Sequence, residues 1–334
     1  MLSIDGGGTR GYLPALVLRE LEYRAGCRAS ELFDVIVGTS TGGIIGIGLA
    51  VGRSAEELAD FYPRYGRAIF GGIDGRPEWK RRLLGPTGNV VADFRNSGRI
   101  LGSPFGGDKR RGGSARHSAD GLNGALHEVL GESRLSGVST PLIATTYDAS
   151  ADCPIVLSSR DASRASEYDL SLHEVARATS AAPTFFPALE TTWAGARRRF
   201  IDGGVWANNP AHIGLLEALT RTGGDLSSIV VVSLGTGAAP GAPSFQSDLN
   251  WLGVAMDTMS VATTVQTGHL LCQRYLPPDR YFRLQVVDRD IAGAMNDASA
   301  ERLTALAAAA SRMIADQGSR LDSIVKQLQD RRPR

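Results

Sequence analysis

The chain has 334 residues, of which 43% are hydrophobic and 21% charged, and its 36 basic side chains nearly balance 35 acidic ones. This composition supports a large buried core, excludes intrinsic disorder, and argues against a dedicated nucleic-acid binder. Three widely separated cysteines predict neither disulfides nor a zinc site, and no signal-peptide pattern opens the sequence. We therefore expect a cytoplasmic globular protein without a metal or cofactor and without a nucleic acid polymer as partner.

Apolar runs alternate with helical patterns along the chain. A strand at residues 1–4 precedes a helix at 13–23, and a strand at 33–37 precedes a helix from about residue 43. Further strands are predicted at 142–146, 155–157, 199–201 and 229–234, and further helices at 171–179, 211–221, 248–275 and 299–329. Such alternation is typical of an α/β layer fold with a mainly parallel sheet.

Residues 71–116 interrupt this alternation with eleven glycines and little periodicity. From Arg76 to Arg116 there are ten basic and three acidic residues, a local excess of seven positive charges. One interpretation is a solvated surface insertion. The other is a basic flap whose residues, among them Arg110, Arg111 and Arg116, meet anionic lipid headgroups or a phosphate-bearing regulator.

The segment at residues 38–42 (GTSTG) follows a predicted strand and opens a predicted helix. This is the context of a nucleophile elbow, G-x-S-x-G, in which Gly38 and Gly42 leave room around an exposed Ser40 hydroxyl. The N-terminus of the following helix favours developing negative charge there. The alternative is that Ser40 only caps the helix.

Residues 5–11 (DGGGTRG) allow two interpretations. The glycine spacing matches the dinucleotide fingerprint G-x-G-x-x-G after a strand, at Gly6, Gly8 and Gly11, but no acidic residue ends the second predicted strand. The second interpretation is an oxyanion hole, which an exposed serine nucleophile requires, and we prefer it for that reason. Its predicted members are Gly6, Gly7 and Gly8, with Arg10 adding positive charge.

A serine nucleophile also needs a base. None of the five histidines lies in a glycine-rich loop after a strand, where α/β enzymes tend to place catalytic groups: His117, His127, His173, His212 and His269. Asp202 does stand at such a strand end, before Gly203 and Gly204. An Asp before two glycines is also a common turn, so these residues alone leave both interpretations open.

Three motifs in this order, at residues 5–11, 38–42 and 202–204, resemble the patatin-like phospholipase family. Similar stretches lie around them at 33–36 (FDVI), 181–187 (AAPTFFP), 233–237 (SLGTG) and 296–299 (NDAS). The resemblance covers residues 1–315, for which we predict a single acyl hydrolase domain that includes the basic insertion. Residues 316–334 are predicted to be a helix end and a basic tail.

The resemblance implies a Ser-Asp dyad acyl hydrolase on a three-layer α/β/α fold. By similarity, Ser40 is the nucleophile, Asp202 the general base and the glycine-rich loop the oxyanion hole. The implied reaction releases fatty acids from phospholipids at the inner membrane face, without a cofactor. The chain is also compatible with patatin-like effectors of bacterial antiphage defence that cyclic nucleotides activate, which suggests a cyclic dinucleotide as a regulator.

Three alternatives stay open. In the first, the substrate is a lysolipid, a galactolipid or another ester. In the second, the chain binds a dinucleotide through Gly6, Gly8 and Gly11. In the third, it is a binding module without activity. The sequence does not specify positional preference on the lipid or the oligomeric state.

Overall fold

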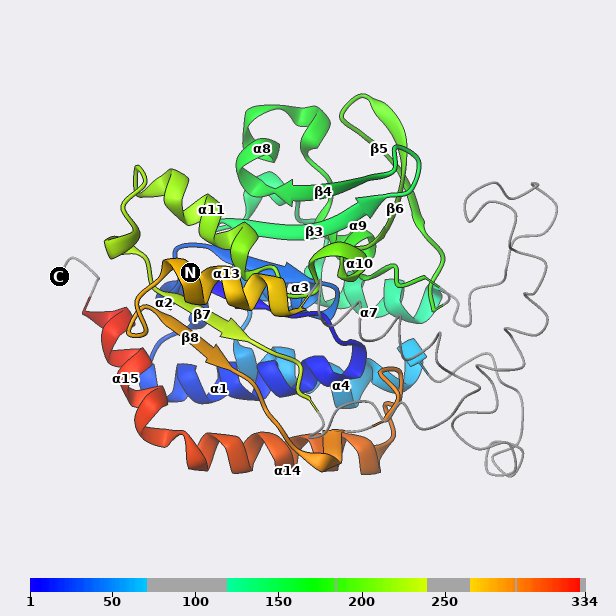
Figure 1. Cartoon of the computed structure of the whole chain (residues 1–334). Helices are drawn as coiled ribbons and strands as arrows, with labels where there is room; N and C mark the ends of the chain where they lie inside the picture. Colours follow the sequence, from blue (N-terminus) through cyan, green and yellow to red (C-terminus); the bar gives the residue numbers. More distant parts are fainter. Residues whose placement is uncertain (71–118, 184, 239–264, 292, 331–334) are drawn as a thin grey trace, which may run out of the picture.

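The computed structural model describes residues 1–70, 119–183, 185–238, 265–291 and 293–330 (Figure 1). Several predictions concern residues outside these ranges: the basic insertion with Arg110, Arg111 and Arg116, His117, the helix at 248–264 and the end of the basic tail. In the part that is described, a mixed sheet lies between two layers of helices, which confirms the three-layer α/β/α fold.

Eight strands form one sheet in the order β5-β6-β3-β2-β1-β7-β8, with β4 paired to β3. The strands are β1 (Leu2–Ile4), β2 (Ile36–Thr39), β3 (Leu142–Asp148), β4 (Cys153–Ser158), β5 (Leu189–Trp193), β6 (Ala196–Asp202), β7 (Val231–Leu234) and β8 (Tyr281–Leu284). The ladders from β3 through β2, β1 and β7 to β8 are parallel, whereas β4 and β6 run antiparallel to β3 and β5 runs antiparallel to β6. The carboxyl ends of β1, β2 and β7 therefore share one edge of the sheet.

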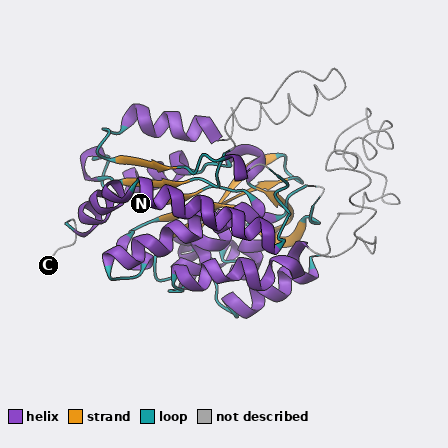
Figure 2. Cartoon of the chain, turned by 90° about the horizontal axis from the view of Figure 1, so that it is seen from below, coloured by secondary structure: helices purple, strands orange, loops and turns teal. Residues whose placement is uncertain are grey.

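Helices cover the two faces of the sheet unequally. The larger layer consists of α1 (Tyr12–Ala25), α3 (Thr41–Ala50), α4 (Ala55–Phe70), α7 (Asp120–Leu130), α9 (Leu172–Ser180), α14 (Ala300–Asp316) and α15 (Gly318–Gln329). The smaller layer consists of α11 (Ala211–Arg221) and α13 (Thr267–Tyr275). Short helices elsewhere are α2 (Ala29–Leu32), α8 (Ser159–Arg164) and α10 (Gly204–Ala207), with 3-10 turns η1 (Gly8–Gly11), η2 (Leu135–Gly137), η3 (Ser166–Tyr168), η4 (Leu226–Ser228) and η6 (Arg289–Ile291). Figure 2 views the larger layer from below, with its helices side by side across the sheet.

The alternation of side chains along each strand divides the apolar core in two. Ile4 and Ile36 are fully buried under the larger layer, while Val37 and Ile143 are buried under the smaller one. Because successive strand residues point to opposite faces, the central strands carry apolar side chains on both sides. This explains why the sequence shows them as continuous apolar runs.

Besides short helices, the predicted elements did not include the longer helices α4 and α7 and the edge strands β5 and β8, for identifiable reasons. Helix α4 contains Pro63 in its interior and α7 contains Gly121 and Gly124, and these residues disfavour helices locally. Strand β8 carries the charged Arg283 within its apolar pattern, and β5 alternates exposed polar residues. The single helix predicted at 299–329 is two helices, because Gln317 leaves the helical conformation between α14 and α15.

Helix α15 packs into the same core cluster as α1 through Leu321, Ile324, Val325 and Leu328. Across the described ranges, no helix combines the length and the apolar character needed to span a bilayer.

Candidate active site

Strand β3 brings Ser40 and Asp202 together. Strand β4 lines one edge of β3, so β2 and β6 share its other edge and meet end to end. Thr39, the last residue of β2, is in register with Thr145, and Asp202, the last residue of β6, is in register with Thr146. The residue that follows β2 therefore lies beside the residue that ends β6, although they are far apart in the sequence.

The two predicted catalytic side chains form a direct hydrogen bond. The Ser40 hydroxyl donates to Asp202 Oδ2 at 2.7 Å, and the Gly204 N–H donates to the other carboxylate oxygen at 2.7 Å. Only 5% of Asp202 is exposed. Burial raises the pKa of Asp202 from 3.8 to about 6, and the hydrogen bonds from Ser40 and Gly204 limit the rise. At neutral pH the carboxylate is thus ionised, and it is a stronger base than an ordinary aspartate.

Ser40 has the backbone conformation of a nucleophile elbow, with φ 55° and ψ −124°. A non-glycine residue with positive φ is uncommon and persists where neighbouring structure enforces it. A side chain at Gly38 would overlap the carbonyl of Gly42, and a side chain at Gly42 would overlap the carbonyl of Ile4. The Ser40 N–H donates to Thr179 Oγ1 at 2.9 Å, which fixes the turn from the side of α9.

The glycine-rich loop is held against this turn through Gly6. The Gly6 carbonyl accepts hydrogen bonds from Thr236 Oγ1 at 2.7 Å and Asn208 Nδ2 at 3.3 Å. Its N–H donates to the Asn208 carbonyl at 3.0 Å. A Cβ atom at Gly6 would lie 3.2 Å from Ser40 Cβ, so the loop passes directly beside the nucleophile.

These contacts narrow the predicted oxyanion hole. Gly6 was expected to provide a donor, but its N–H is already bound to Asn208, so this expectation is corrected. Within the described ranges, the N–H groups of Gly7 and Gly8 have no acceptor. The next residue, Thr9, is fixed because its N–H and hydroxyl both donate to the Met295 carbonyl, at 2.8 and 2.9 Å. Two adjacent free amides can bind a developing oxyanion when they face it.

Arg10 is close enough to Arg302 for the two charges to interact. Burial, followed by the positive charge of Arg302, lowers the pKa of Arg10. Among the residues that the structure describes, the buried Arg10 Nε has no hydrogen-bond partner. No contact in the described part of the chain joins Arg10 to Ser40 or Asp202.

The described histidines lie elsewhere. His127 and His173 stack on each other with ring centroids 4.4 Å apart, and His269 lies 2.9 Å from the Tyr281 hydroxyl. His212 lies on α11 beside Gly268. In the ranges that the structure covers, none of them hydrogen-bonds Ser40 or Asp202, and the side chain that the Ser40 hydroxyl contacts there is the Asp202 carboxylate.

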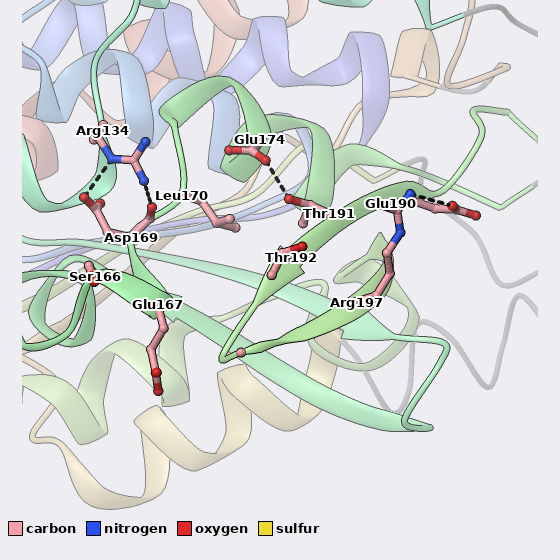
Figure 3. Close-up of a pocket in the computed structure, with 11 residues that line it drawn as sticks. Arg134, Ser166, Glu167, Asp169, Leu170, Glu174, Glu190, Thr191, Thr192 and Arg197 are labelled. Carbon is pink, nitrogen blue, oxygen red and sulfur yellow. Dashed lines mark hydrogen bonds and ion pairs between the residues drawn. The ribbon is translucent and has the colours of Figure 1, made fainter.

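A polar pocket of about 570 Å³ lies at the opposite end of β6 (Figure 3). It contains an ion pair between Arg134 and Asp169 at 2.8 Å and a hydrogen bond from Thr191 to Glu174 at 2.6 Å. Its lining residues belong to none of the three motifs. The pocket is therefore separate from the serine and the aspartate.

Three residues that hold the site were not singled out by the sequence analysis. Thr179 binds the Ser40 N–H and, through its carbonyl, the Gly203 N–H at 3.3 Å, whereas Asn208 and Thr236 hold Gly6. Thr236 lies in the SLGTG stretch after a predicted strand, and this position was a usable signal. Thr179 lies in an ordinary helical pattern, which carries no such signal.

Comparisons with known proteins find a matching family model, similar plant proteins and a similar solved structure. The sequence model described as patatin-like phospholipase matches residues 2–215. The chain is 31% identical over 288 residues to Patatin-like protein 2 of Arabidopsis thaliana, covering 75% of this chain and 65% of that protein. It is 32% identical over 228 residues to Patatin-like protein 2 of Oryza sativa subsp. indica, covering 63% of this chain and 50% of that protein. The structure of VipD from Legionella pneumophila is similar over 93% of this chain and 66% of that chain, with a TM-score of 0.38 and 14% identity.

The chain thus spans between half and two thirds of the length of these two plant relatives. The family model covers more than half of this chain and includes all three motifs. The chain belongs to the patatin-like phospholipase family.

Proposed function

We propose that this chain is a lipid acyl hydrolase that uses Ser40 and Asp202 as a catalytic dyad to release fatty acids from membrane phospholipids. The observation that carries the proposal is the 2.7 Å hydrogen bond from the Ser40 hydroxyl to a buried carboxylate. Membership of the patatin-like phospholipase family supports the substrate class.

The reaction proceeds in two steps. Asp202 Oδ2 accepts the Ser40 proton as the serine oxygen attacks the ester carbonyl, and the protonated base then gives the proton to the leaving alcohol. The Gly7 and Gly8 amides stabilise the negative oxygen of the tetrahedral intermediate. Water, activated by Asp202, then hydrolyses the acyl-enzyme. Since the pKa of Asp202 is raised to about 6, kcat/KM should increase as the pH rises through that value.

The dinucleotide alternative places a pyrophosphate at the start of α1. The second glycine of that fingerprint, where the backbone must approach the pyrophosphate, is Gly8, and a side chain there would overlap the Met295 carbonyl. The space beside Gly8 is thus occupied by main chain, which does not favour this alternative. The position of Gly6 against Ser40 Cβ favours the oxyanion interpretation.

The test is fatty-acid release from mixed phospholipid vesicles in EDTA by wild type, Ser40→Ala and Asp202→Ala. We expect either substitution to reduce release at least about 10⁴-fold. Ser163→Ala, an exposed serine on α8, is the matched control and should retain wild-type activity. Release by Ser40→Ala at the wild-type rate would remove the dyad from the mechanism.

Parallel assays separate the remaining ester classes. Galactolipid vesicles, lysophospholipid micelles and p-nitrophenyl butyrate are offered to the same three proteins. Cleavage of these esters with intact phospholipid would replace the phospholipase with a lysophospholipase, galactolipase or general esterase. NAD binding without any ester cleavage would favour the dinucleotide alternative.

Regulation and location are part of the proposal. We propose that the protein acts peripherally at the inner membrane face and that a cyclic dinucleotide activates it in antiphage defence. The excess of positive charge between Arg76 and Arg116 supports an anionic partner. Adding a panel of cyclic dinucleotides to the vesicle assay tests this activation. The wild type is compared with a variant in which Arg110, Arg111 and Arg116 are all replaced by Glu, which should respond less. Equal rates with and without every nucleotide would exclude this activation.

A further inference from the structure

Arg283 lies on edge strand β8, yet its side chain reaches the beginning of the glycine-rich loop. Strand β7 separates β8 from β1, with Ser233 in register with Arg283 and with Ser3. The Arg283 guanidinium extends across β7 to Asp5, the residue that immediately follows β1. The two residues are 278 positions apart in the sequence.

The guanidinium binds the Asp5 carboxylate with both terminal nitrogens. Nη1 donates to Asp5 Oδ1 at 2.9 Å and Nη2 donates to Oδ2 at 2.5 Å. Nη1 also donates to Ser233 Oγ at 2.8 Å, and Nη2 to Gln285 Oε1 at 3.2 Å. The side chains of Asp5 and Arg283 are 3% and 13% exposed, so this pair is shielded from water. Bidentate pairing of this kind fixes the orientation of both partners.

Asp5 occupies a special position because three glycines follow it. Glycines have no side chains, so this stretch can be oriented only through its main chain or through the residues at its two ends. Gly6 is held by main-chain bonds to Asn208 and Thr236, and Thr9 is held by Met295. The Asp5 N–H donates to the Leu234 carbonyl at 3.0 Å, and the Asp5 side chain adds a second anchor, with Arg283 as its partner.

We propose that Arg283 is a positioning residue that sets the direction of the Gly7 and Gly8 amides toward the oxyanion. The proposal rests on the proposed acyl hydrolase function. Arg283 touches neither Ser40 nor Asp202 in the described structure, so it acts through Asp5. It also lies beyond residue 215, where the match to the family model ends, so a residue outside the matched segment completes the site.

The first experiment compares wild type, Arg283→Gln and Arg283→Lys in the hydrolysis of p-nitrophenyl butyrate. Displacement of oxyanion donors by a fraction of an ångström should lower kcat by about 10- to 100-fold, while KM stays within about twofold. Lysine keeps the charge but cannot form the bidentate pair, so Arg283→Lys should recover only part of kcat.

A second readout isolates the oxyanion step. A fluorophosphonate probe phosphonylates an activated serine through a negatively charged intermediate that needs the same donors. Its rate with Ser40 should fall in parallel with kcat in both Arg283 variants. Arg160→Gln is the matched control. Arg160, on α8, forms an ion pair with the buried Glu217 of α11, with 3.0 Å between Nη1 and Oε2, and neither residue contacts the loop in the described structure. This control should change stability without changing kcat or the phosphonylation rate.

The double variant Asp5→Asn/Arg283→Gln guards against misfolding. It replaces the ion pair by two neutral amides and leaves no buried charge, which makes it the safer variant if Arg283→Gln does not fold. Wild-type kcat and phosphonylation rate in a folded Arg283→Gln or double variant would overturn the proposal. Equal losses in Arg160→Gln would also overturn it, since the effect would then be general destabilisation.

Failure of the proposed function gives a different result. If wild type is phosphonylated at Ser40 but releases no fatty acid from phospholipid, the proposed substrate is wrong, and the phosphonylation rates still decide the role of Arg283. If the probe does not label wild type, both proposals are wrong.

Discussion

The hydrogen-bonded pair of Ser40 and Asp202 and the glycine-rich loop lie side by side, yet they are positioned in different ways. Ser40 and Asp202 follow from the register of a single strand, since Thr39 and Asp202 pair with consecutive residues of β3. The loop at residues 5–11 depends instead on contacts from separate later segments. Those anchors are Asn208, Thr236, Arg283 and Met295.

The two parts differ in which segments of the chain position them. The Ser40–Asp202 pair depends on short strands, close-fitting glycines and the register of β2 and β6 on β3. The orientation of the glycine-rich loop depends on contacts from later segments, which reach it only after the sheet is assembled. A single substitution at the turn around Ser40 should therefore abolish most of the activity. A substitution at one anchor of the loop should reduce the activity only partly, because the other anchors remain.

Among substitutions that keep both Ser40 and Asp202, the largest effect is expected for Gly42→Ala. The new Cβ would overlap the main-chain carbonyl of Ile4, which cannot move without displacing β1. We expect hydrolysis to fall more than about 1000-fold or the protein not to fold. Gly124→Ala in α7 meets no atom within 4 Å and should raise the free energy of unfolding by up to about 1 kcal/mol. An active, folded Gly42→Ala would show that the turn is more adaptable than the contacts indicate.

Asp202→Asn should separate stability from catalysis. Because burial raises the folded-state pKa of Asp202 from 3.8 to about 6, the carboxylate destabilises the fold above pH 6, and this cost disappears below pH 4. Asparagine should therefore raise the free energy of unfolding by about 3 kcal/mol at pH 8 and leave it unchanged at pH 3.5. Urea denaturation at both pH values measures this, with Asp161→Asn, at a half-buried position on α8, as the control. A gain that is the same at both pH values would contradict the assignment to Asp202 ionisation.

Thr236→Val tests one anchor of the loop. Valine keeps the shape but removes the 2.7 Å hydrogen bond to the Gly6 carbonyl, which then retains only the longer bond from Asn208. We expect kcat to fall about 10-fold with little change in KM, because the loop loosens but stays in place. Thr220→Val removes a hydrogen bond within α11 and is the matched control. A loss as large as that of Gly42→Ala would erase the distinction between turn and loop.

The smallest effect is expected for Tyr62→Phe. Its hydroxyl is 2.6 Å from Thr41 Oγ1, and burial raises the pKa of Tyr62, so the hydroxyl stays neutral. Removing this hydrogen bond should cost about 1 kcal/mol of stability and leave kcat within about threefold, as thermal melting and steady-state kinetics can measure. A larger kinetic loss would mean that α4 also positions the nucleophile.

The three motifs and the layered fold were predictable because each motif joins a buried strand to glycines. The pairing of Ser40 with Asp202 was implied by family resemblance alone. The spacing of the motifs does not reveal that β2 and β6 share an edge of β3, since that arrangement depends on antiparallel pairing by β4 and β6.

The anchors of the loop were harder to predict for a physical reason. A charged residue such as Arg283 is unfavourable in a buried strand unless a partner neutralises it, and the partner is Asp5 at the other end of the chain. The same long-range dependence explains the correction at Gly6, whose N–H is bound by the carbonyl of Asn208. Such contacts between distant segments cannot be predicted from the pattern of residues around either partner.

The late position of these anchors has a consequence for biosynthesis. The segment that carries both Ser40 and Asp202 is translated before Thr236, Arg283 and Met295, and 93 residues separate Asp202 from Met295. At about 5–20 residues per second, a ribosome needs about 5–20 s to add them. The nascent chain therefore carries Ser40 and Asp202 well before the anchors of its glycine-rich loop have been synthesised. If the proposed function is correct, full activity is reached only after the segment up to Met295 has been translated and folded.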